Sequence, residues 1–296
     1  MKRRSFIQKS SLLAFSMSAF GNISWNGRNF EGDSATTTDI LGPFYRPGSP
    51  IRTNLIPENS KGKVLYLDGT IFQKGGKKPL SGALIEIWQC DENQVYDNTS
   101  DEFLFRGAQV TGKDGKYSFK TIVPLSYSAS ETQWRPAHIH LRVSSPDHQD
   151  LISQIYFKGD PHLDEDASSS SPLSVHRILE LGRNQQGESQ VTFDIRMQET
   201  FPLDQAMHNK IAGLYQLEKG NAEFTFVDDL LFLKYNGQIM EGLAYKGNNT
   251  FEGGLGYVKA RFELLADGGS IVHLSIGGYD DGDLSSVRTG TRYLKY

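Results

Sequence analysis

Short runs that alternate apolar and polar residues, separated by turn residues, fill the chain from about residue 37 to 200. The candidate strands are Val64–Ile71, Ala83–Cys90, Ala108–Thr111, Tyr117–Ile122, Ile139–Val143, Leu151–Phe157 and Gln190–Met197. Only the short stretch Ser174–Gly182 has a helical pattern. Many short strands at regular spacing are typical of a β-sandwich, so we expect one over residues 37–200.

A second pattern of strands follows a boundary near residues 198–202. It comprises Ala222–Val227, Leu230–Tyr235, Gln238–Tyr245, Tyr257–Leu265 and Ile271–Ile276. Asn236-Gly237 is a strong hairpin signal, and we expect Gly253–Gly256 to flex or to form a bulge. The fold class predicted for the whole chain is therefore all-β, with a small antiparallel β-barrel-like domain over 205–296. This region resembles the lipocalin-like domains appended to some secreted serine hydrolases.

The N-terminal residues have the pattern of an export signal. A basic stretch with the pair Arg3-Arg4 precedes an apolar run, Leu12–Phe20, that is too short to span a bilayer. The pair and the following Phe6-Ile7 resemble a twin-arginine signal. We expect residues 1–21 to direct export to the periplasm and residues 22–36 to be a linker. An ordinary secretory signal and a disordered basic tail are the alternatives.

Charge and cysteine content argue against some partners and cross-links. The net charge of −4 gives no reason to expect binding to nucleic acid. With Cys90 as the one cysteine, no intrachain disulfide can form. We expect no membrane-spanning segment. The sequence does not decide whether the chain forms a homo-oligomer.

The segment Arg135–His140 contains the most informative chemistry. His138 and His140 lie two residues apart in a β-rich run, so both side chains point to the same side of the strand. Two imidazoles on one face of a rigid element are half of a metal site. Further ligands must then come from elsewhere in the chain.

Eight motifs in a fixed order suggest where those ligands lie. They are Gly42–Pro50, Leu80–Cys90 with Tyr96, Phe105–Gly107, Thr111, Asp114–Phe119, Thr121–Pro124 with Tyr127, Trp134–His140 and Ser153–Pro161. In this order the motifs resemble the intradiol ring-cleavage dioxygenases, which are non-haem iron(III) enzymes. The iron-binding subunit of protocatechuate 3,4-dioxygenase is the most similar branch. The resemblance covers roughly residues 38–198.

The resemblance implies specific roles. It makes four side chains the iron(III) ligands: Tyr96, Tyr127, His138 and His140. It places Arg135 and Gln154 beside the substrate ring, where Arg135 stabilises developing charge, and we assign the uptake of a substrate proton to Tyr127. Three aromatic residues are expected to line or border the pocket: Tyr45, Trp88 and Trp134.

The implied reaction inserts both atoms of O₂ into a catechol-type ring. The ring is cleaved between its two hydroxylated carbons and gives a muconate-type diacid. Two phenolates favour ferric over ferrous iron, which agrees with the implied cofactor. The loop Ser128–Trp134 carries Glu131 and no basic residue, which disfavours a carboxylated substrate.

Two other classes of function compete with the dioxygenase. An exported binding protein could use the same sandwich with an inactive site, although the presence of all four candidate ligands argues against it. A zinc hydrolase would need a third histidine or carboxylate ligand, for which Asp160, His162 and Asp164 are candidates.

Overall fold

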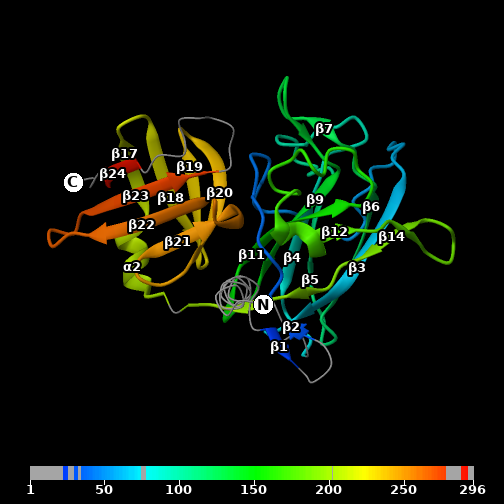
Figure 1. Ribbon diagram of the computed structural model, residues 1–296, viewed down its shortest axis with the longest axis horizontal. Helices are drawn as coiled ribbons and strands as arrows, with labels where there is room; N and C mark the ends of the chain where they lie inside the picture. Colours follow the sequence, from blue (N-terminus) through cyan, green and yellow to red (C-terminus); the bar gives the residue numbers. More distant parts are fainter. Residues whose placement is uncertain are drawn as a thin grey trace, which may run out of the picture.

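The computed structural model describes residues 23–25, 30–32, 35–74, 78–201, 203–277 and 288–292. Figure 1 shows two β-structured units side by side, with the sandwich in blue to green and the barrel in yellow to red. The predicted all-β class is confirmed. The export segment predicted for residues 1–21 lies outside the described residues. Within the stretch expected to be a linker, β1 (Ile23–Trp25) pairs with β2 (Phe30–Gly32).

The N-terminal unit is built from two five-stranded sheets. The first has the order β12-β11-β9-β4-β5. Its strands are β4 (Leu84–Trp88), β5 (Arg106–Val110), β9 (His138–Ser144), β11 (Leu151–Phe157) and β12 (Ile178–Leu179). The second has the order β13-β14-β3-β15, and β6 also pairs with β3. Its strands are β3 (Val64–Phe72), β6 (Lys116–Ile122), β13 (Gly182–Arg183), β14 (Ser189–Thr192) and β15 (Ile195–Arg196).

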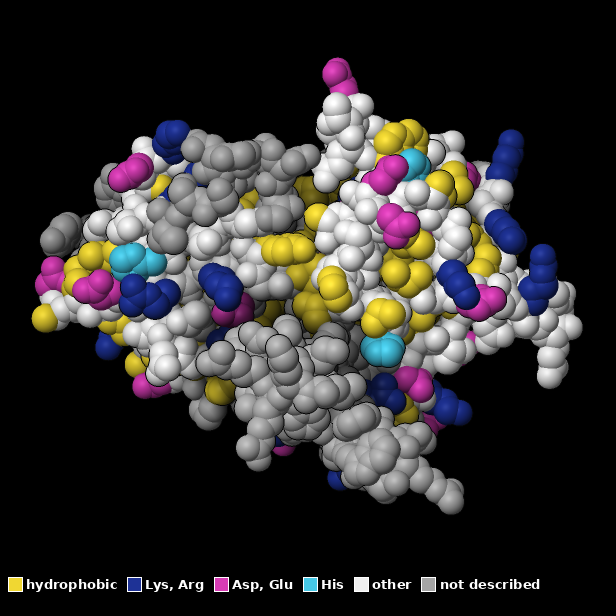
Figure 2. Space-filling view, in the orientation of Figure 1, with side chains coloured by type: hydrophobic (Ala, Val, Ile, Leu, Met, Phe, Trp, Pro, Cys, Tyr) yellow, Lys and Arg dark blue, Asp and Glu magenta, His cyan; other side chains and the backbone are white. Residues whose placement is uncertain are grey.

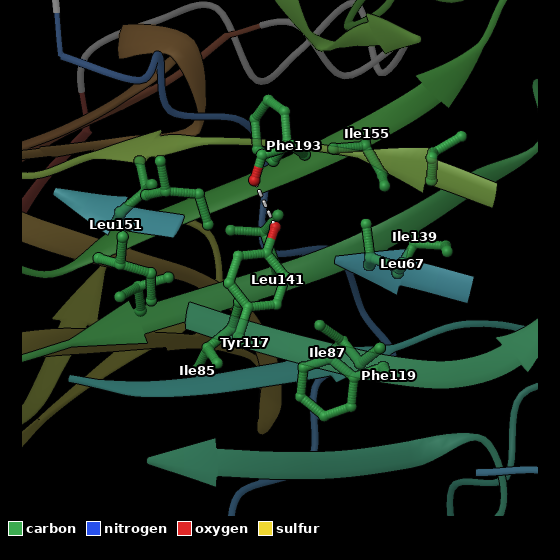
Figure 3. Close-up of a cluster of buried hydrophobic side chains, with 14 of the residues drawn as sticks. Leu67, Ile85, Ile87, Tyr117, Phe119, Ile139, Leu141, Leu151, Ile155 and Phe193 are labelled. Atoms are coloured by element: carbon green, nitrogen blue, oxygen red, sulfur yellow. Dashed lines mark hydrogen bonds between the residues drawn. The ribbon is translucent and has the colours of Figure 1, made fainter. Parts of the chain in front are cut away.

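Apolar side chains from the facing sides of the two sheets form the sandwich core. Ile139, Leu141 and Val143 of β9 project into it, together with Ile85 and Ile87 of β4. Figure 3 shows this cluster, in which the hydroxyl of Tyr117 donates a hydrogen bond of 2.6 Å to the carbonyl oxygen of Phe193. The alternation along these strands places one face of each in the core, as two packed sheets require.

Two expectations about local structure were wrong. The helix expected at Ser174–Gly182 is instead a short 3-10 helix, η1 (Pro172–Arg177), followed by β12 and β13. The Ser171 side chain caps η1 at its start, and Arg177 is buried at its end, so the chain turns into β12 beside β11. The expected strand Gln190–Met197 is divided into β14 and β15. Asp194 lies at the division and accepts a hydrogen bond from the Thr70 backbone N–H.

The C-terminal unit is a closed antiparallel barrel of eight strands. They are β17 (Gly213–Leu217), β18 (Asn221–Val227), β19 (Leu230–Tyr235), β20 (Gln238–Tyr245), β21 (Thr250–Gly253), β22 (Val258–Leu264), β23 (Ser270–Ile276) and β24 (Arg288–Arg292). The predicted hairpin at Asn236-Gly237 is confirmed, and both residues have positive φ as its turn requires. Residues Gly254–Gly256 form a 3-10 turn, η2. Large apolar side chains, including Phe224, Phe251 and Phe262, fill the barrel.

Short elements join or flank these units. They are β7 (Tyr127–Ser128) paired with β8 (Trp134–Arg135), β10 (His148–Gln149) paired with β16 (Gln198–Glu199), and α2 (Gln205–Ile211). Helix α2 was not expected from the sequence, and the Asp204 side chain caps its first turn. Within the described residues, no helix has the length and apolar character needed to cross a membrane.

The barrel packs directly on the sandwich. Leu230 and Phe232 of β19 lie in one buried cluster with Leu41, Tyr45 and Trp88 of the sandwich unit. Figure 2 shows hydrophobic side chains gathered where the two units meet. The barrel therefore covers part of the first sheet, on the face opposite the sandwich core.

Candidate metal centre

The face of β9 that points away from the sandwich core carries His138, His140 and Arg142, all of them buried. Strand pairing places Trp88 of β4 and Gln154 of β11 opposite His140. Paired residues on neighbouring strands project to the same side of a sheet. The alternation in β9 thus separates an apolar core face from a polar face that is also buried.

The four predicted metal ligands come together on this polar face. The Nε2 atoms of His138 and His140 lie 3.1 Å apart. The hydroxyl oxygen of Tyr96, from the loop after β4, lies 3.1 Å from Nε2 of His138. Tyr127 of β7 is adjacent, its ring centroid 5.8 Å from that of Tyr96 and 5.6 Å from that of His138. The four donor groups therefore surround one buried point.

The donor set suits a metal ion. Nδ1 of His138 donates a hydrogen bond of 2.6 Å to the carbonyl oxygen of Pro136, so Nε2 carries a free lone pair. Burial lowers the pKa of His138 and His140, which keeps both imidazoles neutral, the form that binds metals. Burial raises the pKa of the Tyr96 and Tyr127 phenols, so both need a nearby cation to ionise. Two phenolates and two imidazoles fit iron(III).

A guanidinium is fixed beside the four ligands. Nη2 of Arg135 donates to Oε1 of Gln154 at 2.8 Å, and Nε forms an ion pair of 2.7 Å with Oδ2 of Asp166. The amide of Gln154 in turn donates to the carbonyl oxygen of Ile40 at 2.8 Å. Arg135 and Gln154 thus lie in contact, and their partners hold them in place, while their position beside a substrate ring stays a prediction.

Sequence reasoning missed the groups that support this pair. The hydroxyl of Tyr156 donates to Asp39 at 2.8 Å and lies 3.1 Å from Oε1 of Gln154. Asp39 also forms a buried ion pair with Arg177. Tyr156 follows Gln154 by two residues in β11, so strand alternation could have placed it on the polar face. No local pattern identifies Asp39, Asp166 or Arg177, because their partners are distant in the sequence.

The three predicted pocket residues occupy different positions. The indole of Trp88 is buried and stacks on the His140 ring, with centroids 4.9 Å apart and planes 8° from parallel. Tyr45 packs behind Trp88 at 5.0 Å. Trp134 is 41% exposed and stacks on His162 at 4.8 Å. Their roles toward a substrate stay predictions.

The candidate ligands for zinc have other partners. Asp160 accepts hydrogen bonds from the Ala137 backbone N–H and the Ser126 hydroxyl. His162 pairs with Glu165 at 3.2 Å. In the described part of the chain, no three His, Cys, Asp or Glu side chains are grouped to hold a metal ion. A zinc hydrolase therefore has no ligand set among these residues.

Comparison with known proteins shows the family to which this chain belongs. A family model described as "Dioxygenase" matches residues 40–199, more than half of the chain. The chain belongs to the intradiol ring-cleavage dioxygenases. The matched region contains all four predicted ligands, together with Arg135 and Gln154, and it ends before the barrel.

Individual relatives agree with this family. A chlorocatechol 1,2-dioxygenase of Rhodococcus opacus is 32% identical over 158 residues, which is 46% of this chain and 61% of that protein. A catechol 1,2-dioxygenase of Candida albicans is 35% identical over 161 residues, 46% of this chain and 52% of that protein. The solved catechol 1,2-dioxygenase of Pseudomonas arvilla C-1 superposes with a TM-score of 0.52 at 26% identity, covering 67% of this chain and 69% of that one. The chain thus spans little more than half the length of the two curated relatives.

Proposed function

We propose that this protein is a non-haem iron(III) intradiol dioxygenase that cleaves a catechol-type ring with O₂. The observation that carries the proposal is the convergence of Tyr96, Tyr127, His138 and His140 on one buried point, with a fixed guanidinium beside it. Iron(III) held by these residues would withdraw electron density from a bound catechol ring, which would make a ring carbon reactive towards O₂. Membership of the dioxygenase family supports the same activity.

Arg135 supplies fixed positive charge to the reaction. Its ion pair with Asp166 and its hydrogen bond to Gln154 hold the guanidinium before a substrate arrives. A preorganised charge stabilises negative charge that develops on the ring and on its oxygens, and it costs no reorganisation during the reaction. The Gln154 amide is held by Ile40, so it can orient a substrate oxygen.

Tyr127 is the ligand best suited to receive a substrate proton. It lies in β7, a strand of two residues that pairs only with β8 among the described strands, whereas His138 and His140 lie within the central strand β9. A side chain on a short peripheral strand moves at a lower cost than one in a packed sheet. Tyr127 is therefore the residue that would take up a hydroxyl proton from the catechol.

The substrate is proposed to be a catechol without a carboxylate. The loop between Tyr127 and Arg135 contains Glu131 and no lysine or arginine, so it offers no partner to a carboxylate. The relatives named as catechol and chlorocatechol 1,2-dioxygenases support this class of substrate.

Isotope labelling tests the reaction. The iron-loaded chain is mixed with catechol, with chlorocatechol and with protocatechuate under ¹⁸O₂, and each product is analysed by mass spectrometry. We expect a diacid with two labelled oxygens from the first two substrates. His138→Ala abolishes it, whereas the matched His148→Ala retains it, because His148 makes the same contact to a proline carbonyl outside the site. A wild-type chain that is folded and inert towards all three would favour a binding protein.

We also propose that the chain is exported through the twin-arginine route, on the basis of Arg3-Arg4 and the apolar run after it. Replacing both arginines by lysine keeps the charge and alters the motif. We expect the variant to stay in the cytoplasmic fraction, while the parent chain reaches the periplasm. Equal export of both would point to an ordinary secretory signal.

A further inference from the structure

The two histidine ligands are oriented in different ways. Nδ1 of His138 is fixed by its hydrogen bond to Pro136. Nδ1 of His140 is buried and has no hydrogen-bond partner among the described residues. Metal-binding histidines usually have the second nitrogen fixed by such a bond, which sets the ring orientation. The orientation of His140 must therefore come from packing.

Besides the proposed ligands His138 and Tyr96, two other residues pack against the His140 ring. Trp88 stacks on it nearly in parallel, 4.9 Å away. Gly42 also approaches the ring, and a Cβ atom at this glycine would lie 3.1 Å from Cε1 of His140. Gly42 has a φ of +77°, which further favours glycine at this position. The ring is thus positioned by an indole and by a tight stretch of backbone.

The barrel supports the first of these groups through a stack of rings. Tyr45 packs on Trp88 with centroids 5.0 Å apart. Phe232 of β19 stacks on Tyr45 at 5.5 Å, with the two planes 9° from parallel. Both Tyr45 and Phe232 are buried. A continuous series of aromatic contacts therefore runs from the barrel to His140.

The barrel supports Gly42, the second of these residues, through the carboxyl group of Glu241. Oε1 of Glu241 in β20 accepts a hydrogen bond of 3.0 Å from the backbone N–H of Leu41, the residue before Gly42. Glu241 is fully buried and also accepts from the N–H of Gly242. This contact joins residues 200 positions apart and holds the segment that approaches His140.

We infer that the C-terminal barrel is part of the metal centre, and that Phe232 and Glu241 are positioning residues that set the orientation of His140. Phe232 acts through Tyr45 and Trp88, and Glu241 acts through the backbone at Leu41 and Gly42. His138, which has its own hydrogen bond, does not depend on the barrel. The inference rests on the proposed function in treating His140 as an iron ligand.

Three barrel variants and one control test this inference in the full-length chain. Phe232→Leu opens the aromatic stack, and Glu241→Leu removes the acceptor for Leu41. Glu241→Gln keeps an accepting oxygen and is the conservative variant. Phe226→Leu is the matched control for Phe232→Leu, because Phe226 lies in the same barrel and stacks on His208 instead.

The first readout is ¹⁵N NMR of the imidazoles in the metal-free chain, with circular dichroism to show that each variant is folded. We expect His140 signals to shift and broaden in Phe232→Leu and in Glu241→Leu, while the Nδ1 signal of His138, which is fixed by Pro136, changes much less. Glu241→Gln and Phe226→Leu are expected to retain the parent signals of His138 and His140, and Phe226→Leu changes only those of His208, the ring it contacts. Unchanged His140 signals in both Leu variants, or equal changes at the two histidines, would overturn the inference.

The second readout is iron(III) affinity. We expect about tenfold weaker binding in Phe232→Leu and Glu241→Leu, the scale found when groups supporting a ligand are removed. Affinity equal to that of the parent in both variants would contradict the inference. Failure of the parent chain to bind iron would instead reject the proposed function, and the NMR comparison would still report whether the barrel orients His140.

Discussion

The two faces of β9 are buried by different parts of the chain. Ile139, Leu141 and Val143 face the second sheet of the same sandwich. His138 and His140 face the other way, toward loops and the C-terminal barrel. Antiparallel sheets commonly leave one face in water. Here the second face is polar and yet buried, which suits a metal centre and requires other parts of the chain to cover it.

The two faces of β9 therefore place different requirements on their side chains. The apolar face needs side chains of suitable size and shape, and many combinations satisfy it. The polar face needs donor groups, a fixed charge and support from residues far away in the sequence.

The largest effect is expected for His140→Ala. The change removes one of the four proposed iron ligands, so we expect loss of bound iron and of ring cleavage, because the remaining three cannot fix the geometry. Iron content and oxygen uptake measure both. Retention of full iron content would show that His140 is not a ligand.

A large effect is also expected for Asp166→Ala. Breaking a buried ion pair leaves the Arg135 charge unpaired, which costs about 3–5 kcal/mol of stability. We expect a lower midpoint in urea and a lower kcat, because the guanidinium loses its anchor. Asp164→Ala is the control, since Asp164 is exposed two residues away. Equal stability of the two variants would show that the pair with Arg135 contributes little.

The stability of the fold should depend on pH through the carboxyl group of Glu241, which lies between the barrel and the sandwich. Burial raises the pKa of Glu241 to about 8, and Asp39, itself paired with Arg177, adds to the effect. The native chain then keeps a proton that the unfolded chain loses above its ordinary pKa of 4.5. Stability should therefore fall as pH rises from about 4.5 to 8, by up to ~1.4 kcal/mol per pH unit.

Glu241→Gln removes that titration. We expect the unfolding free energy of this variant, measured in urea at several pH values, to vary less across this window than that of the parent chain. Glu252→Gln, in the same barrel but paired with Lys259 near the surface, should follow the parent. An unchanged slope in Glu241→Gln would mean that the carboxyl ionises normally in the fold.

The smallest effect is expected on the apolar face. Ile139→Val removes one buried methyl group next to both histidines in the sequence and should cost about 0.5–1.5 kcal/mol. We expect iron affinity and kcat to match the parent, because the side chain points into the sandwich core. A loss of iron at equal folding would show that the two faces are coupled.

Most strands could be predicted because alternation is a local signal. The runs Leu230–Tyr235 and Gln238–Tyr245 coincide with β19 and β20. The helix expected at Ser174–Gly182 was wrong, since burial of Arg177 against Asp39 is a tertiary effect. The break between β14 and β15 likewise depends on Asp194 and its contact with Thr70.

Sequence motifs and the family resemblance predict the proposed metal ligands, but not the residues that support them. His138 and His140 follow from spacing, and the two tyrosines follow from the order of motifs. Asp39, Asp166 and Glu241 carry no local signature, because each acts on a residue brought close by folding. Glu241 and Leu41 are the clearest case, as one belongs to the barrel and the other to the sandwich unit.

The most direct test is a visible absorption spectrum of the iron-loaded full-length chain, recorded under nitrogen with and without catechol. Two tyrosinate ligands predict a broad tyrosinate-to-iron(III) band that shifts when catechol binds, and Tyr96→Phe should weaken that band. A folded chain that holds no iron, or that binds iron without such a band, would contradict the four-ligand centre on the polar face of β9.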